Sequence, residues 1–251
     1  MDLFTRWLEA LEERHMRALS FQAVRRSVQA LSSLYIERRN RIGQGAALDG
    51  EGKRAAFALY FAPLHFLLVR EIVMAVGADR LSIPALLDLG CGTGVAGAAW
   101  ASTMSLSPRV SGVDRHPWAV TEARWTYGVF GLDSSAKTVD INIFKAPDRT
   151  AVVAAFILNE LPEEARERWR HSMLRTAERG HPVLVVEPIA KKFSPWWDDW
   201  AEAFTAAGGR SDEWRFYPEL PDRLALMDKA TGLNHRELTG RSLWLPAPGA
   251  Q

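Results

Sequence analysis

Apolar residues recur at helical spacing through the first part of the chain. Leu3, Trp7 and Leu11 lie four residues apart, and a second series of this kind runs over 24–35. Ser20 precedes the second series and belongs to a residue type that favours the N-cap position of a helix. The pattern therefore predicts two helices, the second of which begins near Ser20.

A cluster of glycines then separates these helices from a strongly apolar segment. We expect two further helices at 53–61 and 63–76, with Pro63 opening the second and Gly77 closing it. The longest apolar run, 55–69, has 15 residues, whereas a membrane-spanning helix needs about 20. The first residues also lack the basic and apolar regions of a signal peptide. We therefore expect no membrane contact and a cytoplasmic location.

The pattern changes after Pro84 to short apolar runs that alternate with helical stretches. We expect strands at 85–88, 110–114, 137–141, 151–157 and 183–187. We expect helices at 94–106, 117–130, 163–179 and 195–207. Such alternation predicts a parallel sheet with crossover helices, that is, a Rossmann-like α/β fold. The tail from Asp212 is ambiguous, with 241–245 as a candidate final strand.

Composition adds two constraints. The chain of 251 residues is 47% hydrophobic and 24% charged, which suits a packed core, and its length allows one large domain or one medium domain with an appendage. Its single cysteine, Cys91, excludes an internal disulfide and any metal site built from several cysteines. We expect no metal cofactor.

The segment 86–97 carries the most informative motif. Its sequence is LLDLGCGTGVAG, in which a buried strand leads through three glycines at alternate positions into a helix of small residues. Glycine permits positive φ and lets a ligand approach the bare backbone. Amides at the start of the following helix attract electron-rich ligand atoms. The alternative is a tight turn that binds nothing.

Two classes of ligand fit such a loop. Gly92, Gly94 and Gly97 satisfy the dinucleotide fingerprint, and Asp114 follows about 20 residues later, as that fingerprint requires. Asp88, however, precedes the first glycine by two residues, where it would repel a pyrophosphate but suits a ligand with an ammonium group. The pattern Asp-x-Gly-x-Gly-x-Gly resembles motif I of the class I S-adenosylmethionine-dependent methyltransferases, whose cofactor has a cationic methionine end and no phosphate.

A second motif supports this resemblance. Asp114 ends an expected strand and Pro117 opens the next helix, as in the family's second motif, whose acid accepts both ribose hydroxyls. Asp140 occupies the position at which that family usually has a carboxylate that binds the adenine amino group. The alternatives are an ordinary N-cap for Asp114 and a surface position for Asp140. The resemblance implies that S-adenosylmethionine contacts Asp88, Leu89, Gly90, Cys91, Gly92, Thr93, Gly94, Asp114, Arg115, Asp140, Ile141 and Phe156.

The expected strand 151–157 leads into the sequence LNELP at 158–162. In this fold the carboxyl end of that strand lies at the ligand crevice, so Asn159 and Glu160 are the candidate polar groups near a methyl acceptor. Alternatively, Asn159 caps the next helix and Glu160 is solvated. The segment lacks the Asn-Pro-Pro-Tyr motif of base-amino methyltransferases, and Cys91 within the glycine loop does not suit a covalent cysteine mechanism. The catalytic residue therefore stays open.

Charge is unevenly distributed, although its formal sum is only +1. Seven arginines and one acid lie between Arg14 and Arg41, whereas 55–251 holds 21 basic and 23 acidic residues. Arginine suits phosphate groups, so a basic helical prefix indicates RNA, with a solvated helix face as the alternative. The candidate substrate contacts are Arg38, Arg39, Arg41, Trp196 and Trp197. The two tryptophans either stack on a base or pack in the core.

Two further segments resemble a narrower family. The sequences ALYFAPL at 58–64 and ILNELP at 157–162 look like the Rsm-twenty-two-type family of ribosomal small-subunit methyltransferase-like proteins, which also carry a helical N-terminal region. That family has a late cysteine cluster, and here no cysteine follows Cys91. The helical prefix is also similar to that of the aminoglycoside-resistance methyltransferases of small-subunit ribosomal RNA, whose motif I differs.

Residues and resemblance together favour one function and leave two alternatives. We expect an N-terminal helical domain over 1–80 and a methyltransferase domain over 81–251 that uses S-adenosylmethionine. Its expected substrate is RNA, such as ribosomal RNA, held with the ribosomal small subunit through the basic N-terminal helices. The first alternative is a small-molecule methyltransferase whose helical prefix is a lid over an apolar cavity. The second is a ribosome-assembly factor that binds the cofactor without turnover.

Overall fold

The computed structural model describes residues 2–17, 19–37, 48, 50–190, 194–233 and 235–247. Its backbone contacts divide the chain into two compact units. The helical unit comprises Met1–His65 and Tyr217–Leu238, and the sheet unit comprises Phe66–Phe216 and Thr239–Gln251. The expected boundary between folding domains near residue 80 stays a prediction.

The helical unit is built from amphipathic helices. Its elements are α1 (Leu3–His15), α2 (Phe21–Glu37), α3 (Glu51–Ala56), the π-helical segment η2 (Phe57–Phe61) and α9 (Asp222–Thr231). Asp2 caps α1 by accepting from the amide of Thr5 at 2.8 Å, and Ser20 accepts from the amide of Ala23 at 3.3 Å. The expected N-cap of the second helix is therefore confirmed.

One continuous helix, Glu51–Ala75, replaces the two helices expected at 53–61 and 63–76. It includes α3, η2 and α4 (Ala62–Ala75). Pro63 has no amide hydrogen to donate to an earlier carbonyl, and the neighbouring Ala62 amide bonds to the carbonyl of Phe57, five residues back. The wider π-helical turn accommodates the proline without ending the helix. By length and composition this helix could cross a bilayer, but 61% of its most apolar window is buried.

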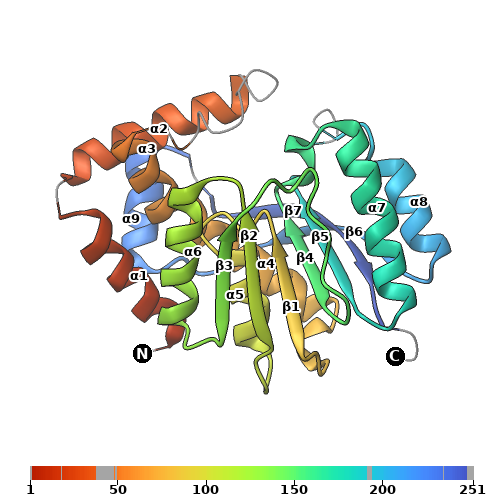
Figure 1. Ribbon diagram of the computed structural model, residues 1–251. Coiled ribbons are helices and arrows are strands. Elements are labelled where there is room, and N and C mark those ends of the chain that lie inside the picture. The colour runs from red at the N-terminus through yellow and green to blue at the C-terminus, as the bar shows by residue number, and fades with distance from the viewer. Residues whose placement is uncertain are drawn as a thin grey trace. The chain divides into compact units, whose positions relative to one another are not determined.

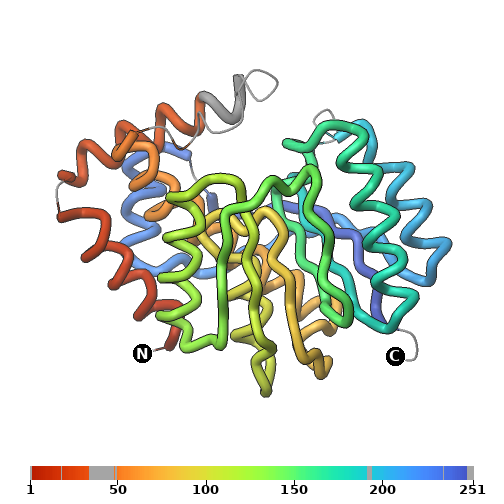
Figure 2. Tube along the Cα trace, in the orientation of Figure 1, coloured from red at the N-terminus to blue at the C-terminus, as the bar shows by residue number. Residues whose placement is uncertain are grey.

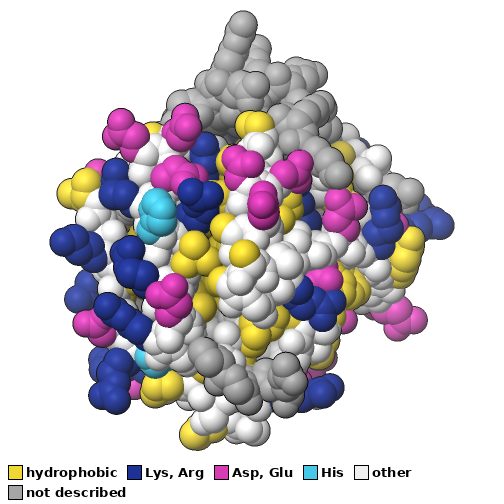
Figure 3. Space-filling model, turned by 90° about the vertical axis from the view of Figure 1, so that its right-hand side faces the viewer, with side chains coloured by type: hydrophobic (Ala, Val, Ile, Leu, Met, Phe, Trp, Pro, Cys, Tyr) yellow, Lys and Arg dark blue, Asp and Glu magenta, His cyan; other side chains and the backbone are white. Residues whose placement is uncertain are grey.

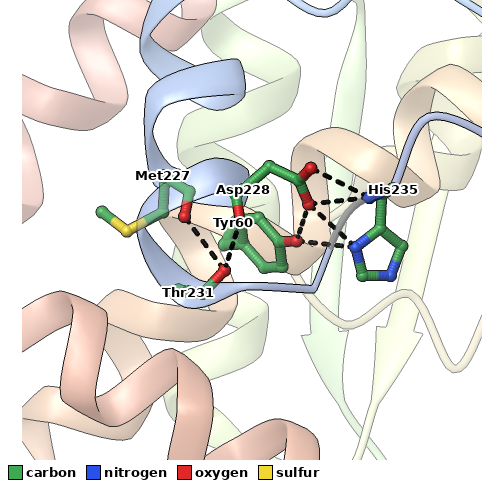
Figure 4. A network of polar contacts seen from close by, with 5 residues as sticks. All are labelled: Tyr60, Met227, Asp228, Thr231 and His235. Carbon is green, nitrogen blue, oxygen red and sulfur yellow. Dashed lines mark hydrogen bonds and ion pairs between the residues drawn. The ribbon is translucent and has the colours of Figure 1, made fainter.

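A buried polar network connects η2 to α9 and to the residues after it (Figure 4). The hydroxyl of Tyr60 donates to Oδ1 of Asp228 at 2.5 Å and lies 2.7 Å from Nδ1 of His235. The backbone amide of His235 donates to the same carboxylate at 2.9 Å. Burial and the bond to Asp228 raise the pKa of Tyr60 far above its usual value, so its hydroxyl stays protonated and donates. The network fixes the C-terminal end of α9 to η2.

The sheet unit contains a seven-stranded mixed sheet with the order β3-β2-β1-β4-β5-β7-β6 (Figure 1). Its strands are β1 (Ala85–Leu89), β2 (Arg109–Asp114), β3 (Ser134–Thr138), β4 (Ala151–Ala155), β5 (Val183–Glu187), β6 (Arg210–Phe216) and β7 (Leu238–Leu245). Pairs among β1 to β5 are parallel, and β7 runs antiparallel to β5. This is the Rossmann-like α/β fold that the sequence predicts.

Helices cover both faces of this sheet. They are η3 (Ala78–Arg80), α5 (Val95–Thr103), α6 (Pro117–Val129), η4 (Leu158–Glu160), α7 (Glu163–Glu178) and α8 (Trp197–Ala206). Leu87 and Leu89 of β1 share a core cluster with α7 and α8. Asp88 between them contacts Gly97 of α5 and Tyr127 of α6. Successive side chains of a strand point to opposite faces, so α5 and α6 lie on one face of the sheet and α7 and α8 on the other. Figure 2 traces the path of the chain through these elements.

Two parts of the sequence prediction for the sheet are wrong. The third strand occupies 134–138 instead of 137–141, because Asp140 begins a turn in which its Oδ1 accepts from the amide of Asn142 at 2.9 Å. Neither β6 nor α9 is predicted, and β7 begins three residues before the candidate strand 241–245. The sequence of β6, RSDEWRF, has the charged composition of an edge strand and no apolar run.

Replacement of Trp200, whose indole is fully buried, tests the packing of the core between α8 and the sheet. Trp200 stacks on Phe204 and meets Trp196 at a centroid distance of 5.0 Å. Trp200→Ala should lower the free energy of unfolding by about 3–5 kcal/mol, because it removes apolar contacts and leaves a cavity. Urea unfolding measures this, with Leu106→Ala at an exposed position as the control. Equal losses in both variants would contradict this packing.

Candidate cofactor site

The loop between β1 and α5 owes its shape to three glycines with positive φ. The φ angles are 64° at Gly90, 50° at Gly92 and 83° at Gly94. The amide of Gly94 donates to the carbonyl of Cys91 at 2.7 Å and closes the turn. Residues with a side chain rarely adopt such angles, so the alternating glycines are required by the backbone itself.

The two sides of this loop differ in the space beside them. A Cβ atom at Gly94 would lie 2.9 Å from the Tyr127 ring, and one at Gly97 would lie 2.7 Å from Oδ2 of Asp88. A Cβ atom at Gly92 would meet nothing within 4 Å. Gly94 and Gly97 therefore serve close packing, whereas Gly92 lies beside open space that a ligand can occupy.

Asp88 holds the loop from the core side. Its side chain is 1% exposed, and its Oδ2 accepts from the amide of Gly97 and from the hydroxyl of Tyr127, both at 2.8 Å. Burial raises the pKa of Asp88 to about 7, against the lowering effect of these two bonds. The structure thus uses Asp88 to join β1, α5 and α6, and its burial disfavours direct contact with a ligand.

Asp114 holds the same loop from the end of β2. Its Oδ2 accepts from the amide of Gly92 at 2.9 Å, and its Oδ1 accepts from the amide of His116 at 2.8 Å. Unlike Asp88, the side chain is half-buried. Each carboxylate oxygen has a second acceptor site, so Asp114 can fix the loop and still accept from the hydroxyls of a ligand.

Two polar side-chain atoms beside these carboxylates lack hydrogen bonds. Within the part of the chain that the structure describes, neither Oγ1 of Thr93 nor Nδ1 of His116 has a partner, although both atoms are buried. Thr93 is 3% exposed and lies in the glycine loop, and His116 follows Asp114. Buried polar atoms without partners are rare in proteins.

The thiol of Cys91 is buried in the glycine loop. Burial, together with the charges of Asp88 and Asp114, raises the pKa of Cys91 well above its usual value. The thiolate is the nucleophilic form of cysteine, so this environment disfavours the reactive form. That Cys91 does not act covalently stays a prediction.

The end of β4 brings a second group of expected residues toward the loop. Phe156 has φ of 60°, a strained angle for a residue with a side chain. Ile157 packs directly on Gly90, where its Cγ1 would lie 2.2 Å from an added Cβ. Glu160 forms a 3.5 Å ion pair with Arg115 from the end of β2. Residues 156–160 therefore lie along one side of the glycine loop.

Asn159 and Glu160 have different surroundings. The side-chain amide of Asn159 donates to Oε2 of Glu187 at 2.6 Å and accepts from the indole of Trp196 at 3.0 Å. Glu160 is exposed and reaches Arg115. The alternative in which Asn159 caps the following helix is wrong, because Pro162 stands at the N-cap of α7 and no side chain caps it.

The remaining expected residues lie in three kinds of place. Ile141 is buried and its carbonyl accepts from the indole of Trp169 at 3.0 Å, while Asp140 is exposed and engaged in its own turn. Leu89 is fully buried at the end of β1. Arg38, Arg39 and Arg41 lie outside the described residues.

Trp196 and Trp197 do not form a stacking surface for a base. Both are largely buried in the cluster between α7, α8 and the sheet. The ring of Trp197 is covered by the guanidinium of Arg241 at 4.1 Å, and that of Trp196 by Arg166 at 5.5 Å. Their burial corrects the expectation of substrate contact, and core packing, the alternative, is what the structure shows.

Two further residues of this region were not predicted from the sequence. Tyr127 of α6 supports Asp88, and Glu187, fully buried at the end of β5, binds Asn159. Glu187 had a detectable signal, namely an acid directly after the four apolar residues 183–186. Tyr127 had none, because aromatic residues are ordinary in a helix that packs on a sheet. Among the described residues no group of three or more His, Cys, Asp or Glu side chains could hold a metal ion.

No protein-family model matches the sequence, and no curated protein matches it significantly. Several solved structures are similar. A Pyrococcus horikoshii protein provisionally assigned as an RNA methyltransferase covers 74% of this chain and 85% of its own, with 13% identity and a TM-score of 0.49. The magnesium protoporphyrin IX methyltransferase of Synechocystis, solved with bound SAH, covers 72% and 83%, with 17% identity and a TM-score of 0.44. The plantazolicin methyltransferase BpumL covers 94% and 99%, with 10% identity and a TM-score of 0.48. At this level, similarity assigns no function.

Replacement of Asp88 by Asn tests the buried carboxyl. Between about pH 4 and pH 7 the folded state keeps a proton that the unfolded chain has released, because folding raises the pKa of Asp88 to about 7. The free energy of unfolding should therefore fall as pH rises through this window, by on the order of 4 kcal/mol, and Asp88→Asn should lack this contribution. Urea unfolding across this pH range measures the difference. Parallel curves for both proteins, with Glu178→Gln as a surface control, would refute the assignment.

Proposed function

We propose that this protein is an S-adenosylmethionine-dependent methyltransferase. The observation that carries the proposal is the half-buried carboxylate of Asp114 at the glycine loop, which accepts from the amide of Gly92 at 2.9 Å. In a dinucleotide site, loop amides of this kind face a pyrophosphate. Here the carboxylate of Asp114 binds the Gly92 amide in that environment, so the loop suits a ligand that is cationic or neutral near this glycine.

The residues present fit this cofactor. The open space beside Gly92 gives it room, and the half-buried Asp114 has acceptor sites for its two ribose hydroxyls. The exposed Asp140 can reach the adenine amino group only by leaving its turn with Asn142. When bound, the cofactor supplies a methyl group on a sulfonium, a leaving group that is already activated.

The protein's own contribution to such a reaction is positioning and exclusion of water. A sulfonium donor needs no metal or covalent intermediate to react with a nitrogen or oxygen held in line with the methyl group, so orientation accounts for much of the rate. Asn159, beside the glycine loop at the end of β4, is the side chain that we assign to orienting the acceptor. Glu160 pairs with Arg115 and joins the loops that follow β2 and β4.

RNA is the acceptor that we propose first. The described arginines of the basic prefix include Arg17 and Arg26, which are exposed on or beside α1 and α2. Their Nε atoms bond to backbone carbonyls one turn earlier, which leaves the terminal nitrogens of the guanidinium groups able to bind phosphates. On the face of the sheet unit that carries α7 and α8, Lys and Arg side chains lie among Asp and Glu side chains (Figure 3).

A small-molecule acceptor is the second candidate, and one observation favours it. The helical unit contains a cavity of about 220 Å³ between α1, η2 and α9. Its lining is mostly apolar and includes Leu8, Leu11, Phe21, Leu59, Leu224 and Met227. Glu12 and Arg223 also line it, and Oε2 of Glu12 lies 3.7 Å from Nε of Arg223. Such a cavity suits one large apolar group with a polar end.

Substitution of Gly92 by Trp tests cofactor binding. The indole would enter the open space beside the loop, and a φ of 50° costs a residue with a side chain about 1–2 kcal/mol. Isothermal titration should show S-adenosylmethionine binding to the wild type and to Gly128→Trp, an exposed glycine of α6 with nothing within 4 Å, but not to Gly92→Trp. Equal binding by both variants would contradict the site. Preference for NADH would support a dinucleotide instead.

Distribution of labelled methyl groups tests the acceptor. Cofactor with a labelled methyl group is offered with ribosomal RNA, isolated ribosomal subunits and a metabolite extract in parallel. RNA methylation should appear in the first two. Label in metabolites alone would favour the small-molecule function, and binding without any transfer would favour an assembly factor.

Charge reversal at Arg17 and Arg26 tests the basic prefix. RNA affinity measured across salt concentrations should weaken in Arg17→Glu and Arg26→Glu, and the slope of log K against log salt should drop by about 1 for each phosphate that the variant no longer neutralises. Arg175→Glu, exposed on α7, serves as the matched control and should leave the slope unchanged. The same slope in all variants would remove α1 and α2 from the interface.

A further inference from the structure

Two partners of opposite hydrogen-bonding type hold the side-chain amide of Asn159. On one side, Oε2 of Glu187 lies 2.6 Å from Nδ2. On the other side, the indole nitrogen of Trp196 lies 3.0 Å from Oδ1. An ionised carboxylate only accepts and an indole only donates. Only one orientation of the amide satisfies both, so the positions of its oxygen and nitrogen are determined by the network.

The side chain of Glu187 is held firmly in the core. It is fully buried at the last residue of β5, and its Oε1 also accepts from the backbone amide of Leu158 at 2.9 Å. One carboxylate thus fixes both the backbone of η4 and the side chain that η4 carries. Its cross-strand neighbour on β7 is Arg241, 1% exposed, whose positive charge offsets the buried negative charge.

The amide keeps hydrogen-bonding capacity for a ligand. Nδ2 carries a second hydrogen and Oδ1 a second lone pair, and the Asn159 side chain is half-buried. The strained Phe156 and the contact of Ile157 with Gly90 hold this segment against the glycine loop. A fixed amide beside a cofactor loop can orient a polar group of a second substrate.

We propose that Glu187 is a positioning residue for methyl transfer, acting through Asn159, whose remaining hydrogen and lone pair bind a hydrogen-bonding group of the methyl acceptor. This inference rests on the proposed methyltransferase function. It assigns Asn159 to orienting the acceptor and gives Glu187 and Trp196 no contact with cofactor or acceptor. Neither Glu187 nor Trp196 should therefore affect cofactor affinity.

Glu187→Gln tests the proposal with little change in shape. The amides of Leu158 and Asn159 both need an acceptor, and glutamine offers one oxygen and one nitrogen. Either one bond is lost, or Asn159 turns over and places its nitrogen against the indole nitrogen of Trp196. We expect kcat to fall by about 100-fold, the loss that a small misplacement of a reacting group causes. The dissociation constant for S-adenosylmethionine should stay within about twofold of the wild-type value, since no cofactor contact changes.

A double-mutant cycle separates positioning from a merely structural role. If Glu187 acts only through Asn159, the double variant Glu187→Gln/Asn159→Ala should be no slower than Asn159→Ala alone. Trp196→Phe removes the donor at the other end of the amide and should also lower kcat, which keeps the test valid if Glu187→Gln does not fold. Glu178→Gln, exposed at the end of α7, is the matched control.

The possible results are distinguishable. A loss of kcat in Glu187→Gln with unchanged cofactor affinity, absent from the Asn159→Ala background, supports the proposal. Transfer at the wild-type rate by Glu187→Gln, or additive losses in the double variant, overturns it and leaves the methyltransferase function standing. Absence of transfer by the wild type to RNA and to metabolites overturns the proposed function, and this inference with it.

Discussion

The hydrogen bond between the buried carboxyl group of Asp88 and the amide of Gly97 is the constraint on which the site depends. It fixes the first turn of α5 to β1, and the Tyr127 hydroxyl on the same oxygen adds α6. A side chain at Gly97 would collide with that carboxyl group, which explains the small residue there. The three glycines before it then have little freedom, because the loop must cover a short path between a fixed strand end and a fixed helix start.

The two sides of the glycine loop differ in how their polar groups are hydrogen-bonded. On the β2 side, Asp114 keeps further acceptor sites, and Thr93 and His116 have buried atoms that form no hydrogen bond within the described part of the chain. On the β4 side, the Asn159 amide is held at both ends, by Glu187 and by Trp196. The side with spare hydrogen-bonding capacity suits a cofactor, which would supply the missing hydrogen bonds. The side on which Asn159 is held in one orientation suits the positioning of a second substrate. Both sides lie within the sheet unit, so its core sets the precision of the site.

The sequence was sufficient where one local rule determines the structure. The alternation of apolar runs with helices predicts β1, β2, β4 and β5, and the Asp-x-Gly-x-Gly-x-Gly pattern locates the loop. It was insufficient where structure depends on partners far along the chain. From the sequence, Asp88 resembles a ligand contact, but its side chain is buried. Trp196 and Trp197 resemble a stacking surface, but both pack in the core. The role of Glu187 depends on its contact with Asn159, 28 residues away. Pro63 predicts a helix start, but the π-helical turn before it keeps the helix continuous.

The order of the sheet has a consequence for synthesis on the ribosome. In sequence β6 comes before β7, but in space β7 lies between β5 and β6. When β6 leaves the ribosome, its neighbour in the sheet has not yet been made. The indole of Trp214, which bonds to Ser242 of β7 at 2.8 Å in the folded protein, can then pack only on nearby residues such as Phe216 and Arg210 of β6 itself. The helical unit also needs 217–238 for α9 and its network with Tyr60. Two successive late segments thus complete the two units, so neither unit can finish folding before they have been synthesised.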